Sequence, residues 1–350
     1  MNITAVAERA RVSTATVSRV INGTANVSPE TAERVREAIQ TLDFYPDISA
    51  RTLGSGRSGL YGLIISDITN PYFPELVKAF EDIAVEHGQD VLIANTDYDP
   101  KRMEACVIRM LQRKVDGVAI MTSEMEDRLI HTFSNRQIPT VFMDTRKGVK
   151  GVSTVRVDYA AGVKQAMQHL FDFGHQRIAF ISGPLALSSA QVRAEAFTKS
   201  LRQNGLAREP HMVQEGDHRV EGGHAAMQRI LIASERPTAV LASNDLTAIG
   251  AIGAIHEAGL RIPEDISIIG FDDIELSAYT QPSLTTLHVP RRELAATAFR
   301  SLFRDRDGVA SMSGLKLEHV IRPWLIVRRS TAQAPAGSVQ ARTPRKRSSV

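Results

Sequence analysis

The sequence predicts an α/β protein in which a small all-helical N-terminal unit precedes a core of two doubly wound, parallel-sheet lobes. Three observations predict this class. The chain has 350 residues, which suits two or three domains better than one. Its first 45 residues contain only helical patterns. From residue 60 onward, short apolar runs alternate with amphipathic helical segments, as in parallel sheets that helices cover on both faces.

The first 45 residues predict helices that start at recognisable caps. Asn2 caps a helix over residues 3–10, Ser13 caps one over 14–21, and Ser28 with Pro29 starts a third. Residues 11 and 12 form a tight turn between the first two. The inward-facing residues are Ile3, Val6, Ala7, Ala10, Val17, Val20, Ile21, Ala32, Val35, Ala38, Ile39 and Leu42. This is the helix-turn-helix plan, although a plain three-helix bundle with solvated polar faces shows the same pattern.

The second of these helices presents Thr14, Ala15, Ser18 and Arg19 away from its apolar face. Short side chains allow the backbone to approach the major groove of DNA, and an arginine can donate two hydrogen bonds to a guanine. This face therefore predicts sequence-specific recognition of DNA.

Net charge adds nothing to that prediction. The chain carries a formal charge of +3, but residues 331–350 hold four basic residues and no acid, so the remainder is net −1. We expect this basic tail to be disordered and to add only weak, salt-sensitive contacts. It has no leucine and no heptad, so it predicts no coiled coil.

Residues 46–59 connect the helical unit to the core. Asp47 can cap two helical turns that end at Gly54, although a helix this short is marginal in water, and a plain linker is the alternative. Residues 54–59 match the glycine pattern GxGxxG. A dinucleotide site would need a strand before this pattern and a helix after it, whereas a strand follows here, so we interpret the segment as a flexible linker.

The core predicts alternating strands and helices. Strands are expected over residues 62–66, 91–95, 117–121, 140–143, 178–181, 239–242 and 267–270. Helices are expected over residues 75–87, 101–114, 159–173, 190–204, 222–233 and 246–258. So many units exceed one sheet, and we expect two lobes that divide near Asp158.

Polar residues gather where these strands end, which is where open α/β sheets bind ligands. They are Ser66, Asp67, Asn95, Thr96, Asp97, Thr122, Ser123, Asp144, Asp158, Ser182, Ser243, Asn244, Asp245, Asp272 and Asp273. Any one of them can be a helix cap, so their clustering carries the prediction. Paired acceptors and donors suit the vicinal hydroxyls of a sugar, and Tyr72 and Phe73 add aromatic faces for stacking.

Several classes of protein are disfavoured. Cys106 is the only cysteine, which excludes disulfides within the chain and a cysteine-rich zinc site and suits a reducing cytoplasm. We expect no signal peptide and no membrane span. The sequence has no nucleophile elbow, no HExxH and no P-loop, and its histidines are scattered. We therefore expect no catalytic residues, no metal and no cofactor.

Residues 6–22 resemble the DNA-binding headpiece of the lac repressor (LacI/GalR) family, above all in the run VSTATVSRVIN from Val12 to Asn22. Val27-Ser28 and Tyr45-Pro46 continue the match, which extends to about residue 330. The resemblance implies a headpiece over residues 1–45, a hinge over 46–59 and a homodimer on palindromic, double-stranded operator DNA. The DNA-binding residues that it implies are Ser13, Thr14, Ala15, Thr16, Ser18, Arg19, Asn22, Asn26, Ala50, Arg51 and Leu53.

The resemblance also implies how the hinge and the lobes are built. The hinge helix folds on the operator, and Leu53 wedges into the minor groove. Asp47 departs from the asparagine common in the family. The core is expected to be periplasmic-binding-protein-like over residues 60–330, with 285–289 returning to the first lobe and 320–327 forming the last strand of the second. The first lobe then covers 60–157 and 286–315, and the second covers 158–285 and 316–330.

In this family a small-molecule effector binds between the lobes. The residues implied here are Ser66, Tyr72, Phe73, Asp144, Arg193, His218, Asn244 and Asp272. His218 falls where several relatives place a stacking aromatic residue. A sugar or sugar derivative is the expected effector, and a purine or other metabolite is the alternative; induction and corepression both stay open. The rival functions are a solute-binding receptor without a regulatory role and, more distantly, a Rossmann-type enzyme.

Overall fold

The computed structural model describes residues 2–21, 27–45, 57–122, 125–143, 152–233, 235–306 and 318–335. Residues 46–56 of the predicted hinge and 336–350 of the predicted tail lie outside these ranges. The same holds for six predicted site residues, which are Asn22, Asn26, Ala50, Arg51, Leu53 and Asp144. The chain divides into two units, Met1–Gly59 and Leu60–Val350, each of which is described by itself.

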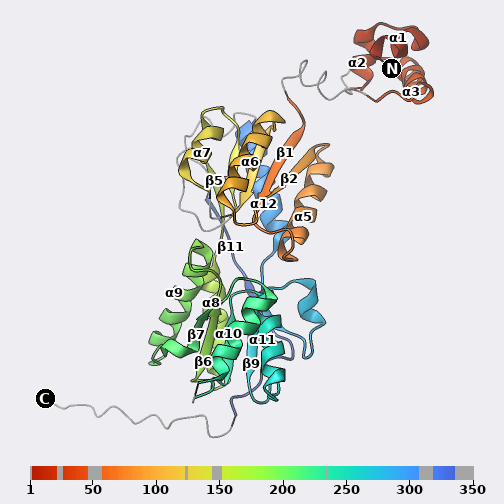
Figure 1. Cartoon of the computed structure of the whole chain (residues 1–350). Coiled ribbons are helices and arrows are strands. Elements are labelled where there is room, and N and C mark those ends of the chain that lie inside the picture. The colour runs from red at the N-terminus through yellow and green to blue at the C-terminus, as the bar shows by residue number, and fades with distance from the viewer. Residues whose placement is uncertain are drawn as a thin grey trace, which may run out of the picture. The chain divides into compact units, whose positions relative to one another are not determined.

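The N-terminal unit contains helices α1 (Ile3–Ala10), α2 (Thr14–Ile21) and α3 (Pro29–Thr41) in its described part (Figure 1). The expected caps are confirmed. The side chain of Asn2 accepts a hydrogen bond from Ala5 N at 3.1 Å, Ser13 Oγ accepts from Thr16 N at 3.2 Å, and Ser28 Oγ accepts from Thr31 N at 3.3 Å. Arg11 ends α1 with a left-handed φ of 53°, which makes the tight turn before α2.

The three helices share one small apolar core. Val6, Val17 and Val35 supply its centre, one from each helix, and have no exposed surface. Ala7, Ala10 and Ala38 are buried beside them. Small side chains at these positions bring the helices close together, so α2 is held firmly while its opposite face stays open to solvent.

The first lobe of the second unit is a parallel sheet with the strand order β11-β5-β4-β3-β1-β2. The strands are β1 (Leu60–Ile65), β2 (Asp90–Asn95), β3 (Gly117–Met121), β4 (Thr140–Phe142), β5 (Ser153–Val157) and β11 (Glu318–Ile321). The helices of this lobe are α5 (Tyr72–Glu86), α6 (Pro100–Gln112), α7 (Asp127–Ser134) and α12 (Arg291–Arg306). Alternation along β1 assigns the two faces: Leu63 and Ile65 pack in the cluster of α5 and α12, and Ile64 packs in that of α6 and α7.

The second lobe has the strand order β12-β10-β9-β8-β6-β7, in which β12 alone of the described strands runs antiparallel to its neighbour. The strands are β6 (Ile178–Ser182), β7 (Val213–Glu215), β8 (Ala239–Ala242), β9 (Ser267–Asp272), β10 (Thr285–His288) and β12 (Trp324–Ile326). The helical segments are α8 (Tyr159–Asp172), α9 (Ser188–Gln203), α10 (Val220–Leu231), α11 (Asp245–Glu257) and the short 3₁₀ turns η1 (Pro210–Met212) and η2 (Glu275–Ala278). Helices cover both faces, so the predicted pair of doubly wound lobes is confirmed.

The route between the lobes differs from the expectation. The segment predicted to return to the first lobe, residues 285–289, contains β10, which pairs with β9 in the second lobe; α12 makes the return instead. The segment 320–327 contains parts of two strands in different sheets, because Pro323 has no N–H to continue a ladder. Two further strands were not predicted: β5, whose polar residues resemble a loop, and β7, a short edge strand.

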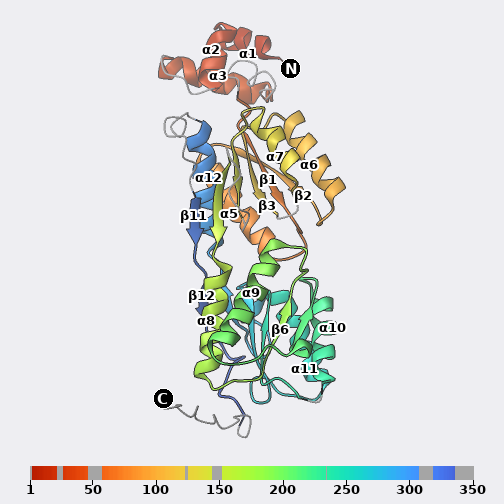
Figure 2. The same ribbon diagram turned by 90° about the vertical axis from the view of Figure 1, so that its left-hand side faces the viewer.

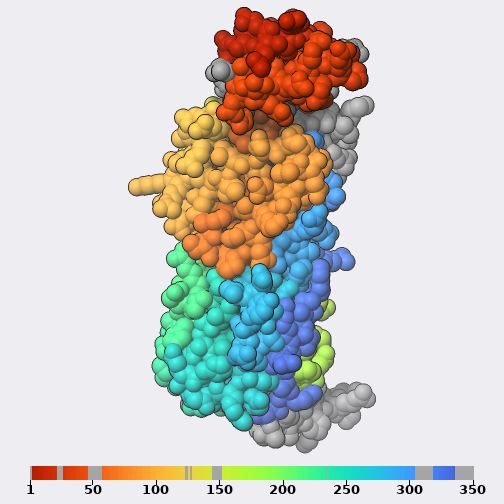
Figure 3. All heavy atoms as spheres, turned by 90° about the vertical axis from the view of Figure 1, so that its right-hand side faces the viewer, coloured from red at the N-terminus to blue at the C-terminus, as the bar shows by residue number. Residues whose placement is uncertain are grey.

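Within the described ranges the chain therefore crosses between the lobes three times, after β5, after β10 and between β11 and β12. The last crossing is visible in Figure 2, where β11 lies beside the first lobe and β12 beside the second. One buried cluster, which includes Leu63 of β1 and Phe271 of β9, runs through both lobes. In Figure 3 the surfaces of the two lobes abut directly. None of the helices in the described ranges has the length and apolar character needed to span a bilayer.

Candidate functional sites

The outer face of α2 is the first candidate site. Ser13, Thr14, Ala15 and Arg19 are exposed, and Thr16 and Ser18 are half-buried. The Ser13 and Thr16 hydroxyls lie 2.9 Å apart at the start of the helix. The helix contains no acidic residue. A face of short side chains with one arginine and no carboxylate is suited to approach a phosphate-lined groove.

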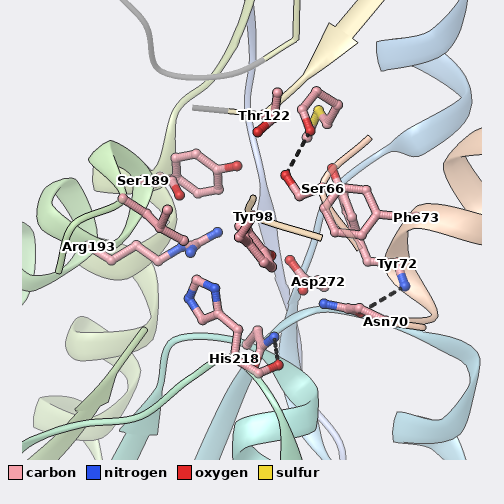
Figure 4. Close-up of a pocket in the computed structure, with 14 residues that line it drawn as sticks. Ser66, Asn70, Tyr72, Phe73, Tyr98, Thr122, Ser189, Arg193, His218 and Asp272 are labelled. Carbon is pink, nitrogen blue, oxygen red and sulfur yellow. Dashed lines mark hydrogen bonds between the residues drawn. The ribbon is translucent and has the colours of Figure 1, made fainter. Parts of the chain in front are cut away.

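The second candidate site is a cavity between the lobes. It contains about 500 Å³ not occupied by protein atoms when the solvent at its mouth is counted. Its residues come from the carboxyl ends of strands or from the helices that follow, in both lobes. The structure brings together seven of the eight residues predicted for the effector, namely Ser66, Tyr72, Phe73, Arg193, His218, Asn244 and Asp272 (Figure 4).

Seven other residues line the cavity: Asn70, Tyr98, Met121, Thr122, Tyr159, Leu187 and Ser189. Thr122 belongs to the predicted set of polar strand ends. Tyr159 follows β5, so the failure to predict that strand concealed it. Tyr98 has a φ of 55°, a backbone conformation that no nearby glycine signals.

Arg193 of α9 is the principal cation of the cavity. Its side chain is buried, and its guanidinium lies 4.0 Å from the ring centroid of Tyr159 and 4.8 Å from that of Phe271. These rings stabilise the cation, but among the described residues Nε has no hydrogen-bond partner. A buried donor without a partner costs free energy, so this group is poised to receive an acceptor from a ligand.

Asp272 ends β9 and supplies a carboxyl group to the cavity. It is 7% exposed, and no described residue donates a hydrogen bond to its carboxyl group. Burial raises the pKa of Asp272 to about 8; Arg193 acts against this rise, and the neighbouring carboxyl of Asp245 adds to it. The carboxyl can therefore change its protonation when a ligand brings new hydrogen bonds.

His218 follows β7 with a φ of 64° and is 8% exposed. Its ring lies against Gly183, where a Cβ atom would come within 1.7 Å of Nε2, so a side chain at position 183 would require the His218 ring to move. Burial, and the charge of Arg193, lower the pKa of His218 to about 3, so the imidazole is neutral. Asn244 supports it, because its Nδ2 donates to His218 O at 2.9 Å while its Oδ1 caps α11 through Thr247 N.

We expect Asp272 to lower the stability of the large unit as pH rises from about 5 to about 8, while the lowered pKa of His218 acts in the opposite direction below about 6.5. Asp272 has a pKa of about 8 in the folded protein and 3.8 as its ordinary value, so the folded state binds the additional proton between these values. In Asp272→Asn, the decrease in the free energy of unfolding between about pH 5 and about pH 8 should be smaller by on the order of 1–3 kcal/mol, and the melting temperature at pH 8 should be higher. Differential scanning calorimetry at both pH values measures this.

The matched control is Asp265→Asn. Hydrogen bonds from Arg261 lower the pKa of Asp265 to about 2, so this half-buried carboxyl stays ionised across the whole range. An identical pH dependence in the wild type and in Asp272→Asn would contradict the assignment.

A helix-turn-helix unit followed by a two-lobed α/β core with a polar cavity defines a class, the DNA-binding regulators that carry a ligand-binding core. Residues 2–47 match the family described as bacterial regulatory proteins, lacI family, and residues 167–331 match the periplasmic binding protein-like domain. The HTH-type transcriptional repressor PurR of Erwinia tasmaniensis is 38% identical to the chain, covering 94% of it and 96% of that relative.

Two other proteins agree with this assignment. Catabolite control protein A of Priestia megaterium is 34% identical and covers 92% of the chain and 98% of its own length. The structure of the lac repressor dimer bound to operator and the anti-inducer ONPF has a TM-score of 0.84 and 30% identity, covering 95% of the chain and 99% of its own. The chain belongs to the LacI family of DNA-binding transcriptional repressors.

Proposed function

We propose that this chain is a homodimeric, cytoplasmic repressor that binds a palindromic operator through α2 and is controlled by a sugar or sugar derivative held in the cavity. The observation that carries the proposal is the buried guanidinium of Arg193, whose Nε has no hydrogen-bond partner among the described residues, together with the buried carboxyl of Asp272 in the same cavity of a chain with a DNA-binding headpiece. The residues Asn22, Asn26, Ala50, Arg51, Leu53 and Asp144 extend these two sites in the proposal.

The chemistry of the cavity favours a polyhydroxylated ligand. Arg193 offers donors, Asp272 offers acceptors, and Ser66 and Ser189 add hydroxyl groups. Vicinal hydroxyls both donate and accept, so they can satisfy the guanidinium of Arg193 and the carboxyl of Asp272 together. Tyr72 and Phe73, whose ring centroids are 5.4 Å apart, supply the aromatic surface against which a sugar ring can stack. A planar purine could use the same rings, which makes it the alternative for the screen.

The experiment has two steps. Thermal-shift measurements on the full chain with D-glucose, D-ribose, glucose 6-phosphate, hypoxanthine and guanine identify the effector class. Rounds of selection from random double-stranded DNA then provide the operator, whose affinity is measured with and without the ligand. A sugar-induced shift and a palindromic consensus are expected; a ligand without any selected DNA sequence would favour the solute receptor. Weaker operator binding in the presence of the ligand would indicate induction, and tighter binding would indicate corepression.

The dimer can be tested independently. The lac repressor structure is described as a dimer, and two half-sites require two headpieces. Val85 of α5, Ile93 of the edge strand β2 and Ile108 of α6 are exposed apolar side chains on adjacent elements of the first lobe. Sedimentation should give twice the chain mass of 38.4 kDa, and a monomer at micromolar concentration would exclude the homodimer.

Arg19→Ala should weaken binding to the selected operator by about 1–3 kcal/mol, with much less effect on random DNA. The reason is that Arg19 is the arginine on the exposed face of α2 and can contact base edges. Fluorescence anisotropy with both DNAs measures the two losses. Arg36→Ala on α3, where Arg36 pairs with Glu33, is the control for lost charge, and equal losses on both DNAs would argue against base recognition.

A further inference from the structure

Arg291, the first residue of α12, connects the first lobe to the effector side of the second. Its Nη1 donates to the backbone oxygen of Asp272 at 2.5 Å, and its Nη2 donates to the backbone oxygen of Asp273 at 2.9 Å. Its side chain is 12% exposed. The helix it starts packs against α5 and the first sheet, so Arg291 reaches across the boundary between the lobes.

The peptide that Arg291 holds has an unusual backbone. Asp272 has a φ of 110° and Asp273 a φ of 56°, values that residues other than glycine rarely adopt. Such conformations persist when the surroundings hold them. The side chain of Asp273 is held separately, by His288 Nδ1 at 2.7 Å and by Arg328 Nη2 at 2.6 Å. Arg291 supplies the matching restraint on the main chain.

Glu75 of α5 completes the arrangement from the first lobe. One of its carboxylate oxygens lies 2.7 Å from Arg291 Nη2, and the other accepts from Glu275 N at 3.2 Å. Glu75 belongs to α5, the helix that also carries Tyr72 and Phe73. In Figure 3, the orange surface of the first lobe meets the light-blue surface of the second lobe on the face toward the viewer.

We propose that Arg291 is a positioning residue of the effector site. By holding the carbonyl groups of residues 272 and 273 while paired with Glu75, it fixes the direction in which the Asp272 carboxyl enters the cavity. It also sets the distance from that carboxyl to the aromatic residues of α5. Arg291 itself does not line the cavity, so it acts through the geometry of Asp272.

A plain tether between the lobes is the competing explanation, and the chain contains a matched control for it. Arg219 also bridges the lobes, with Nη2 at 3.1 Å from Asp67 Oδ2 and 3.4 Å from Asp97 Oδ1. It makes no recorded contact with the peptide of residues 272 and 273 within the described chain. Loss of Arg219 removes a lobe bridge and leaves that peptide held.

Hydrogen exchange of the full-length protein tests the proposal without a ligand. In Arg291→Met, the amides of Ile274 and Glu275 should exchange about tenfold faster, with a smaller increase in Arg291→Lys, because a single ammonium cannot replace the forked guanidinium. Arg219→Met should leave these amides unchanged. Equal acceleration in Arg219→Met, or none in Arg291→Met, would overturn the proposal. If Arg291→Met does not fold, Glu75→Gln, which weakens the same pairing, replaces it.

The second arm rests on the proposed function and uses the ligands of the thermal-shift panel. Arg291→Met should weaken binding of the panel compound recognised by the wild type at least about tenfold, and should add little further loss in an Asp272→Asn background. Additive losses would contradict action through Asp272. If no panel compound binds the wild type, the proposed effector class fails, while the exchange result still decides the role of Arg291.

Discussion

Arg193→Ala is expected to abolish the response of operator binding to the effector while operator affinity without effector stays at the wild-type value. The guanidinium is buried between Tyr159 and Phe271, and its Nε faces a site with no described protein acceptor. When a ligand acceptor is deprived of a buried charged donor, the free energy of ligand binding weakens by about 2–5 kcal/mol, which is roughly 30-fold to several thousandfold in affinity. The headpiece, which contacts the operator, keeps all of its residues.

The measurement is fluorescence anisotropy of labelled operator, titrated with the compound found by thermal shift. The control is Arg202→Ala, which removes an exposed arginine near the end of the same helix. A titration midpoint within twofold of the wild type in Arg193→Ala would contradict the assignment of Arg193. Loss of operator affinity without any ligand would indicate that Arg193 maintains the fold instead of binding an effector.

The N-terminal unit could be predicted closely because its signals are local. Asn2, Ser13 and Ser28 each accept a backbone hydrogen bond at a helix start, and such caps act within three residues. The inward faces follow from a period of 3.6 residues, so Val17 was identifiable as core from its spacing alone. What these residues contact on DNA is not a local property, and it remains a prediction.

The crossings between the lobes could not be predicted in the same way. A strand such as β10 is recognised by its composition. The sheet that it joins, however, depends on its hydrogen bonds to β9, and the local sequence of β10 does not indicate that pairing. The lobe boundaries predicted after residues 285 and 315 were displaced for this reason, because β10 belongs to the second sheet and β11 to the first. Pro323 was available as a clue, since it separates β11 from β12.

The tendency of α/β sheets to bind ligands at the carboxyl ends of their strands explains why some cavity residues were predicted and why other predicted residues do not line the cavity. Parallel strands bring their carboxyl ends together, which placed Ser66, Asn244 and Asp272 in one site without any knowledge of the topology. The same rule included Asp245 and Asp273, which turn away from the cavity and bind other protein groups. The direction in which a side chain at the end of a strand points depends on its tertiary partners, which the local sequence does not specify.

Asp245→Ala is expected to have the largest effect on stability in the chain's described core. Asp245 has no exposed surface and accepts from Ile274 N at 2.9 Å, Ser277 Oγ at 2.6 Å and Thr286 Oγ1 at 2.5 Å. Alanine leaves all three donors buried without a partner, each at a cost of about 1–3 kcal/mol before relaxation. Non-additive relaxation limits the total, so we expect a loss of about 3–5 kcal/mol.

Trp324, the only tryptophan of the chain, lies on β12 of the second lobe, so its fluorescence during urea unfolding reports on the lobe that contains Asp245. The control is Asp158→Ala, which removes a carboxylate that caps α8 through Ala161 N at 3.1 Å and should cost about 1 kcal/mol. Equal losses would show that Asp245 is only a cap. A larger loss at Asp245, together with faster hydrogen exchange of the Ile274 amide, would show that this carboxylate supports the turn from which Asp272 enters the effector cavity. The reason is that Ile274 follows Asp272 by two residues.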